Sequence, residues 1–282
     1  MQALGTLSVS HRPISLPNVR AVIAEPSGEP APMGQKTKYN DSFFDKMFMG
    51  IFTTKMEEVT GKKTELDGYE GLVEISRKVM QGRTPLQQRA AVRQVLMSTL
   101  PPGAPEQNLK NTLDLANMDR QKLLQDSADY AEFLSFRKLF PPTKWSAEFN
   151  AFITIPVFKW LVGPCDLQDV EVNGVMQKSL VKIKKCRYLE NSGCVGMCVN
   201  MCKLPTQDFF TKEFGLPLSM TPNFEDMSCE MVFGKMPAPL DEDPAFQQPC
   251  FEAICTMAQP KSPVCPKLKP ATESVQTDSV LA

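Results

Sequence analysis

The chain has 282 residues, enough for one or two domains with a hydrophobic core, and its 31 basic and 32 acidic residues nearly balance. This balance gives no sign of a nucleic-acid-binding surface, so we expect no nucleic acid partner. No apolar run approaches the roughly 20 residues that span a bilayer, and we expect a soluble or peripheral protein.

The first 35 residues have the composition of a targeting segment. Met1 to Ala24 contains serine, threonine and arginine but no acidic residue and no long apolar core. This pattern is typical of an organellar transit peptide and not of a secretory signal; the alternative is an ordinary disordered tail. Prolines and glycines follow as a linker, so we expect residues 1–35 to be disordered.

Residues 36–163 are expected to be helical. Apolar side chains recur at helical spacing in stretches that predict helices over about 41–59, 68–80, 85–101 and 123–134. Asn40 or Asp41 is the expected cap of the first helix, and Thr84 to Gln87 has the pattern of a capping box.

A segment from Phe136 to Leu161 mixes cations with large apolar side chains. Such a segment can lie at a membrane interface, with its cations toward the headgroups and its aromatic rings at the acyl boundary. The alternative is a buried helix that leads into the next domain.

Beyond residue 163 the pattern changes to strands. Two alternating stretches flank Asn173-Gly174, the pair favoured in tight hairpin turns. We expect a loop at 191–193 with Ser192 as a helix cap, a helix that ends at Gly215, a loop over 217–222 and a strand over 229–233. The fold class is therefore α+β, with a helical N-terminal half and a small cysteine-rich domain at 164–268 that contains an antiparallel hairpin or sheet. Residues 269–282 are expected to form a disordered tail.

All nine cysteines lie between Cys165 and Cys265, and the only histidine, His11, lies in the predicted leader. A metal in the remaining chain must therefore be held by thiolates, carboxylates or backbone groups, and histidine-based catalysis is excluded. Cys194, Cys198 and Cys202 are spaced by one helical turn. On a continuous helix the outer two are about 12 Å apart, so all three reach one compact centre only if the helix bends or breaks.

Gly196 and Asn200 are the weak points for such a bend, and Cys186, Cys229 or the tail cysteines would complete a four-thiolate shell. The spacing leaves three interpretations open: an iron centre, a structural zinc site, and disulfides or plain thiols.

The sequence around these cysteines resembles the plant Dwarf-twenty-seven family of carotenoid isomerases. The similarity runs through residues 185–198, 202–210 and 223–230 and covers about the C-terminal half of the chain. It implies a plastid (chloroplast), iron-containing protein that interconverts all-trans and 9-cis β-carotene, the entry step toward strigolactone hormones.

The resemblance and the missing histidine together lead to a predicted site. We expect iron, as a cluster or a mononuclear centre, with zinc as the alternative, at Cys186, Cys194, Cys198, Cys202 and Cys229. Phe149, Phe152 and Trp160 are expected to contact the carotenoid, and the segment around them to approach plastid membranes. No catalytic residue is assigned. The alternatives are a non-catalytic cysteine-rich metal-binding or thiol-switch protein and a carotenoid carrier.

Overall fold

The computed structural model of the chain describes residues 37–98, 141–251, 254–255 and 263–268. The predicted leader, the predicted helix at 123–134, the beginning of the aromatic and cationic segment and the predicted tail lie outside these residues.

Three helices form the N-terminal part of the fold: α1 (Phe43–Thr60), α2 (Gly68–Met80) and α3 (Pro85–Ser98). The cap predicted for the first helix was wrong, because Ser42 and Asp45 form a reciprocal capping box there. The box predicted before α3 is confirmed: Gln87 N–H donates to Thr84 Oγ1 (3.3 Å) and Thr84 N–H donates to Gln87 Oε1 (2.9 Å).

A long helix and a hairpin follow. They are α5 (Lys144–Val162), β1 (Cys165–Val172) and β2 (Val175–Ile183). Asn173 and Gly174 connect the two strands with φ angles of 52° and 80°. Both angles lie in the left-handed region that the favoured two-residue hairpin turn requires, and the predicted hairpin is confirmed.

The next segment is almost entirely helical. It consists of α6 (Arg187–Ser192), α7 (Val195–Met197), the π-helix η3 (Cys198–Lys203), α8 (Leu204–Asp208) and the π-helix η4 (Phe209–Phe214). The predicted loop at 191–193 with Ser192 as a cap was wrong, since Ser192 ends a helix. That helix begins where Cys186 Sγ accepts the N–H of Leu189 (3.4 Å), and six residues are too few to show a helical period.

Two more strands, β3 (Leu218–Pro222) and β4 (Cys229–Phe233), complete an antiparallel sheet in the order β1-β2-β4-β3. The predicted strand at 229–233 is confirmed, but the loop predicted at 217–222 was wrong. The side chains of Leu218–Pro222 alternate between buried and half-buried, as in a strand. Pro222 is tolerated because β3 is an edge strand. Short 3₁₀ turns follow at η5 (Pro244–Gln247) and η6 (Pro266–Leu268).

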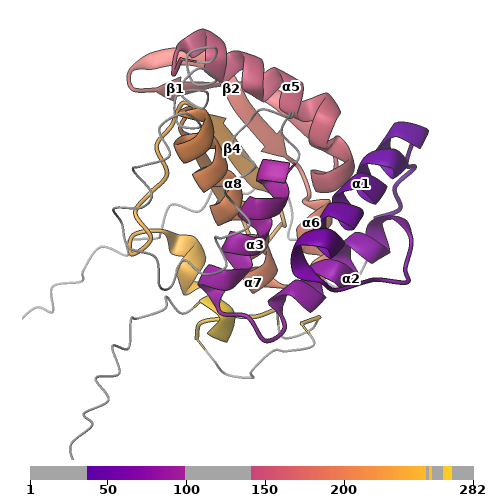
Figure 1. Cartoon of the computed structure of the whole chain (residues 1–282). Helices are drawn as coiled ribbons and strands as arrows, with labels where there is room; N and C mark the ends of the chain where they lie inside the picture. The colour runs from indigo at the N-terminus through magenta and orange to yellow at the C-terminus, as the bar shows by residue number, and fades with distance from the viewer. Residues whose placement is uncertain (1–36, 99–140, 252–253, 256–262, 269–282) are drawn as a thin grey trace, which may run out of the picture.

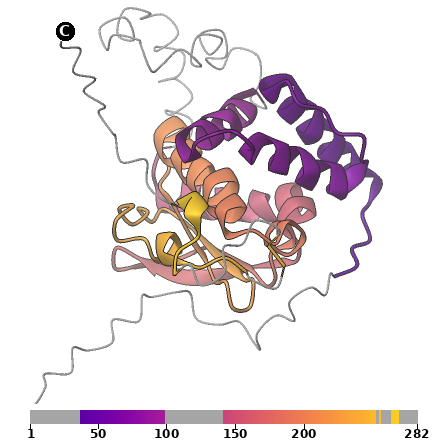
Figure 2. The same ribbon diagram turned by 90° about the horizontal axis from the view of Figure 1, so that it is seen from below.

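The elements pack in layers (Figures 1 and 2). Helix α5 packs along the sheet, chiefly on β2, while η3 and α8 lie between α3 and the strands. One continuous core joins both halves, with Ile75 of α2, Val181 of β2 and Leu189 of α6 among its fully buried members. The α+β fold class is confirmed, whereas the domain division at residue 163 stays a prediction. No helix in the described part of the chain combines the length and apolar character that crossing a bilayer requires.

Candidate functional site

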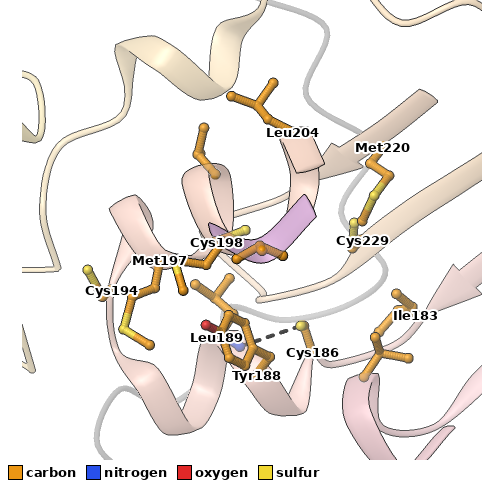
Figure 3. Close-up of a cluster of buried hydrophobic side chains, with 14 of the residues drawn as sticks. Ile183, Cys186, Tyr188, Leu189, Cys194, Met197, Cys198, Leu204, Met220 and Cys229 are labelled. Carbon is orange, nitrogen blue, oxygen red and sulfur yellow. Dashed lines mark hydrogen bonds between the residues drawn. The ribbon is translucent and has the colours of Figure 1, made fainter. Parts of the chain in front are cut away.

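Four of the predicted metal ligands meet around one small cavity, and we call them the first thiol group: Cys186, Cys198, Cys202 and Cys229. Cys186 precedes α6, the next two lie on η3, and the last opens β4 beside Ile183 of β2. Figure 3 shows the labelled Cys186, Cys198 and Cys229 around the same space. Residues far apart in the sequence are therefore gathered by a helix start, a π-helix and a strand.

Cys194, also predicted as a ligand, does not line this cavity. It is the N-cap of α7, with an extended backbone (φ −138°, ψ 114°). The helical path therefore changes at Cys194 and again in η3, whose wider π-helical turn includes Asn200 and carries Cys198 and Cys202 to the same cavity; Gly196 lies inside α7.

Cys194 instead interacts electrostatically with three cysteines of the C-terminal part, and these four form the second thiol group: Cys194, Cys250, Cys255 and Cys265. Cys165 on β1 belongs to neither group. All nine are thiols in the structure. As the side chains are placed, the described residues contain no group of three or more His, Cys, Asp or Glu that could hold a metal ion. Binding would require the thiols to draw together.

Burial governs the chemistry of the first group. Burial raises the pKa of Cys186. Burial and the neighbouring thiols together raise the pKa values of Cys198 and Cys229 further. Burial and the nearby Cys186 raise the pKa of Cys202 to about 12. These groups are thus neutral at pH 7 unless a cation stabilises the thiolates.

One buried cation stands beside them. Lys203 lines the same cavity, and its Nζ pairs with Asp243 Oδ2 (2.7 Å) and donates to Gln207 Oε1 (3.1 Å). Its charge opposes the rise in the pKa values of Cys198 and Cys229. The first group therefore combines four thiols with a fixed positive charge.

A larger apolar cavity of about 270 Å³ lies between the helical layers. Its wall is almost wholly hydrocarbon and aromatic, with contributions from α1, α2, α3, α5, the helical segment and the sheet. The aromatic members of the wall are Phe52, Phe158, Tyr188, Phe209, Phe210 and Phe214. Ser76, Asn150, Thr154 and Thr206 are among its few polar members. Such a cavity suits a hydrocarbon ligand.

The two cavities share part of their walls. Cys202, Tyr188, Val162 and Met220 line both, so a ligand in the apolar cavity lies beside one thiol of the first group. Tyr188 is buried, and its side chain hydrogen-bonds to Ser76. Tyr188 could not be singled out from the sequence, because a tyrosine two residues after a cysteine is not a motif.

The residues predicted to bind substrate lie elsewhere. Phe149 and Phe152 are 36% and 62% exposed, and Trp160 is buried against Phe52 with ring centroids 5.8 Å apart. None of the three lines the apolar cavity. The same helix contributes other residues to it: Asn150, Ile153, Thr154, Phe158, Leu161 and Val162. The predicted residues therefore lie on the same helix as these wall residues but not in the wall, and their contact with a carotenoid stays a prediction.

An aromatic and ionic clamp holds the beginning of α6 next to Cys186. The guanidinium of Arg187 lies between the rings of Tyr39 (4.3 Å) and Tyr69 (3.9 Å) and pairs with both carboxylate oxygens of Asp41 (2.5 and 2.8 Å). It also donates to Trp160 O (3.1 Å). Three separate segments thereby fix the backbone that presents Cys186.

Glu190 extends this clamp. Its carboxylate accepts the N–H (2.7 Å) and hydroxyl (2.8 Å) of Thr37 and pairs with Lys185 Nζ (2.6 Å). Burial raises the pKa of Glu190, but the hydrogen bonds from Lys185 and Thr37 outweigh it and hold that pKa below its ordinary value.

Comparison with known proteins places the chain in a family. Residues 160–242 match the family model described as "Beta-carotene isomerase D27-like, C-terminal". Two curated proteins, each named "Beta-carotene isomerase D27, chloroplastic", are 35% identical over 214 residues. The match to the Medicago truncatula protein covers 76% of this chain and 74% of that protein. The match to the Arabidopsis thaliana protein covers 75% of this chain and 70% of that protein.

No solved structure gives a significant match. The matched family segment contains six of the nine cysteines, among them the whole first thiol group, and the resemblance inferred from the sequence is confirmed. The chain belongs to the beta-carotene isomerase D27-like family.

Proposed function

We propose that the protein is a carotenoid cis/trans isomerase that interconverts all-trans and 9-cis β-carotene, or a closely related carotenoid, at an early step toward strigolactones. The observation that carries the proposal is the apolar cavity whose wall includes Cys202 of the first thiol group. Both relatives are named as chloroplastic beta-carotene isomerases. Their names agree with the transit peptide predicted for this chain and support a chloroplast location.

The cavity supports a carotenoid substrate by its size and chemistry. At about 270 Å³ it lies just below the range of about 300–1,000 Å³ that is typical of ligand pockets. A long polyene exceeds this volume, so we propose that one part of it enters while the rest extends from the cavity. Burial of apolar surface then contributes about 25 cal/mol per Å² to binding.

We propose iron, as a cluster or a mononuclear centre, at Cys186, Cys198, Cys202 and Cys229, with zinc as the alternative metal. The donor set suits a soft-ligand site, since four thiols meet around one small cavity, three of them buried and Cys202 half-buried, and a bound cation would replace their protons. When bound, thiolate-held iron supplies reversible one-electron exchange, which lowers the bond order of a polyene.

The chain's own residues perform the remaining tasks in this proposal. Aromatic and aliphatic side chains of the cavity bind the polyene and exclude water. Tyr188 and Cys202 contact the part of the polyene that lies nearest the first thiol group. Lys203, held by Asp243, balances negative charge on the thiolates.

The proposal is tested by incubating iron-loaded protein separately with all-trans and 9-cis β-carotene and resolving the isomers by chromatography. Both starting isomers should converge on the same mixture. Absence of interconversion for β-carotene and its hydroxylated relatives would contradict the proposal. Stoichiometric binding without isomerisation would identify a carrier instead.

We also propose that α1 and α5 bring the cavity to a membrane surface. Each helix carries exposed apolar side chains: Phe43, Phe44, Met47 and Ile51 on α1, and Trp145, Phe149, Phe152 and Val157 on α5. Both helices also line the cavity, through Phe52 and Met56 on α1 and through Ile153 and Phe158 on α5. Exposed lysines at 46, 144 and 159 suit anionic headgroups.

A further inference from the structure

The second thiol group has no place in the proposed isomerase chemistry. Its four members line neither the apolar cavity nor the cavity of the first group. Cys194 precedes α7, whereas the other three belong to the end of the described chain, which we call the C-terminal segment: residues 250–251, 254–255 and 263–268.

The C-terminal segment packs against the helices that lead to the first thiol group. A Cβ on Gly196 would lie 2.8 Å from Lys267 Cβ, and a Cβ on Gly193 would lie 3.3 Å from Ile254 O. The amide of Asn200 donates to Lys267 O (2.7 Å), and Leu268 is fully buried. The two glycines therefore allow the segment to approach closely, and η3 holds it in place.

Within this segment, two thiols are hydrogen-bond partners. The side chains of Cys250 and Cys265 hydrogen-bond to one another, and both are buried, with 8% and 2% exposure. Their backbones are also tied, since Cys265 N–H donates to Gln248 O (2.9 Å). Two neighbouring thiols whose backbones are tied in this way are candidates for a disulfide, which requires Cα atoms about 4.4–6.8 Å apart.

We propose that Cys250 and Cys265 form a dithiol oxidation site that closes to an intramolecular disulfide on reaction with a small-molecule disulfide. The Cys265 thiolate attacks the oxidant, forms a mixed disulfide and releases one thiolate. The Cys250 thiolate then attacks Cys265 Sγ and releases the second. Two protein S–H bonds are replaced by one S–S bond, and the two electrons and two protons convert the oxidant into two thiols.

The surroundings of the pair set its rate. Burial raises the pKa of Cys265, although the Lys267 N–H and the Cys250 side chain oppose that rise, so the thiolate is scarce at neutral pH. The oxidant reaches the pair when the segment opens locally. Oxidation is therefore slow at neutral pH and accelerates as the pH rises.

The test uses the full chain, reduced completely and then incubated with oxidised or reduced glutathione. Acid quenching, alkylation of the remaining thiols and peptide mass spectrometry then locate each disulfide. We expect a Cys250–Cys265 cross-linked peptide in the oxidised sample alone. Cys255→Ser, at a neighbouring member of the group, and Cys165→Ser, outside it, should both retain the cross-link, whereas Cys265→Ser should abolish it.

Mapping the unsubstituted protein does not depend on whether any variant folds. Alkylation of both Cys250 and Cys265 in the oxidised sample would overturn the proposal, as would a cross-link from either residue to Cys194 or Cys255. Stoichiometric zinc in the reduced protein that is lost in Cys265→Ser would also overturn it, because the pair would then be metal ligands. None of these readouts involves isomerase activity.

Discussion

Cys198 and Cys229 test the first thiol group most directly, because they come from η3 and β4 and are both buried. We expect Cys198→Ala and Cys229→Ala each to lower bound iron and isomerase activity together, since each removes one thiolate donor. Elemental analysis with a visible absorption spectrum measures the first quantity, and isomer chromatography measures the second.

Cys165→Ala is the matched control, because Cys165 lines neither cavity. It should retain iron and activity. Full iron and full turnover in both Cys198→Ala and Cys229→Ala would remove these residues from the proposed centre.

The stabilising contribution of the Glu190 carboxylate should be lost in acid. Because the folded protein holds the pKa of Glu190 below its ordinary value of 4.5, this carboxylate contributes stability that is present above that pH and is lost as the pH falls below it. Glu190→Gln should therefore reduce the difference between the free energies of unfolding at about pH 7 and about pH 4, measured by urea denaturation.

Glu171→Gln on β1 serves as the comparison, since this residue is exposed. The explanation fails if Glu190→Gln and the unsubstituted protein lose the same free energy of unfolding over this pH range.

At the scale of single residues, only part of the candidate site could be predicted from the sequence. Clustered cysteines without histidine pointed to thiol chemistry, and four of the five chosen cysteines do meet. The separation of Cys194 from them could not be predicted, because it depends on where the helix begins and on the π-helical winding of η3. Residues with no local pattern, such as Tyr188, become recognisable only when distant segments pack together.

At the scale of elements, α5 has two faces with separate roles. Ile153 lines the apolar cavity, while Val157, one turn later, is 39% exposed and does not line it. We expect Ile153→Trp to fill part of the cavity and to lower isomerase activity by about 100-fold, because misplacing a substrate by an ångström can have an effect of that size.

Val157→Trp adds the same indole on the outer face and should leave activity close to that of the unsubstituted protein. Circular dichroism verifies that both variants fold. Equal activity in the two variants would mean that the substrate does not occupy this cavity.

The elements differ in how clearly the sequence specifies them. Asn173-Gly174 fixes its hairpin by local backbone preference, and the pattern Thr84 to Gln87 fixes a helix start. By contrast, β3 is short and bounded by prolines, and it becomes a strand because β4 pairs with it. Elements that depend on a distant partner carry little local signal.

At the scale of the whole molecule, exposed aromatic side chains of α5 offer a test of membrane association. We expect the combined Trp145→Ser, Phe149→Ser and Phe152→Ser variant to bind anionic plastid-lipid vesicles at least about tenfold more weakly, since burying one such side chain contributes about 1.5–3 kcal/mol. Vesicle flotation measures this binding.

Val175→Ser with Met176→Ser removes exposed apolar side chains from the β1–β2 hairpin, which do not line the cavity, and serves as the control. It should bind vesicles as the unsubstituted protein does. Equal loss of binding in the two variants would show that exposed apolar area in general, and not α5, governs association.

The contacts around Arg187 also bear on where the predicted transit peptide could be cleaved. Thr37, Tyr39 and Asp41 supply partners to Glu190 and Arg187, so the residues directly after the predicted leader belong to the folded protein. A processing protease that removed Asp41 would leave the buried guanidinium without its carboxylate, at a cost of about 3–5 kcal/mol. If the predicted transit peptide is removed, we expect the new N terminus at or before Thr37, and N-terminal sequencing of the chloroplast form would locate it.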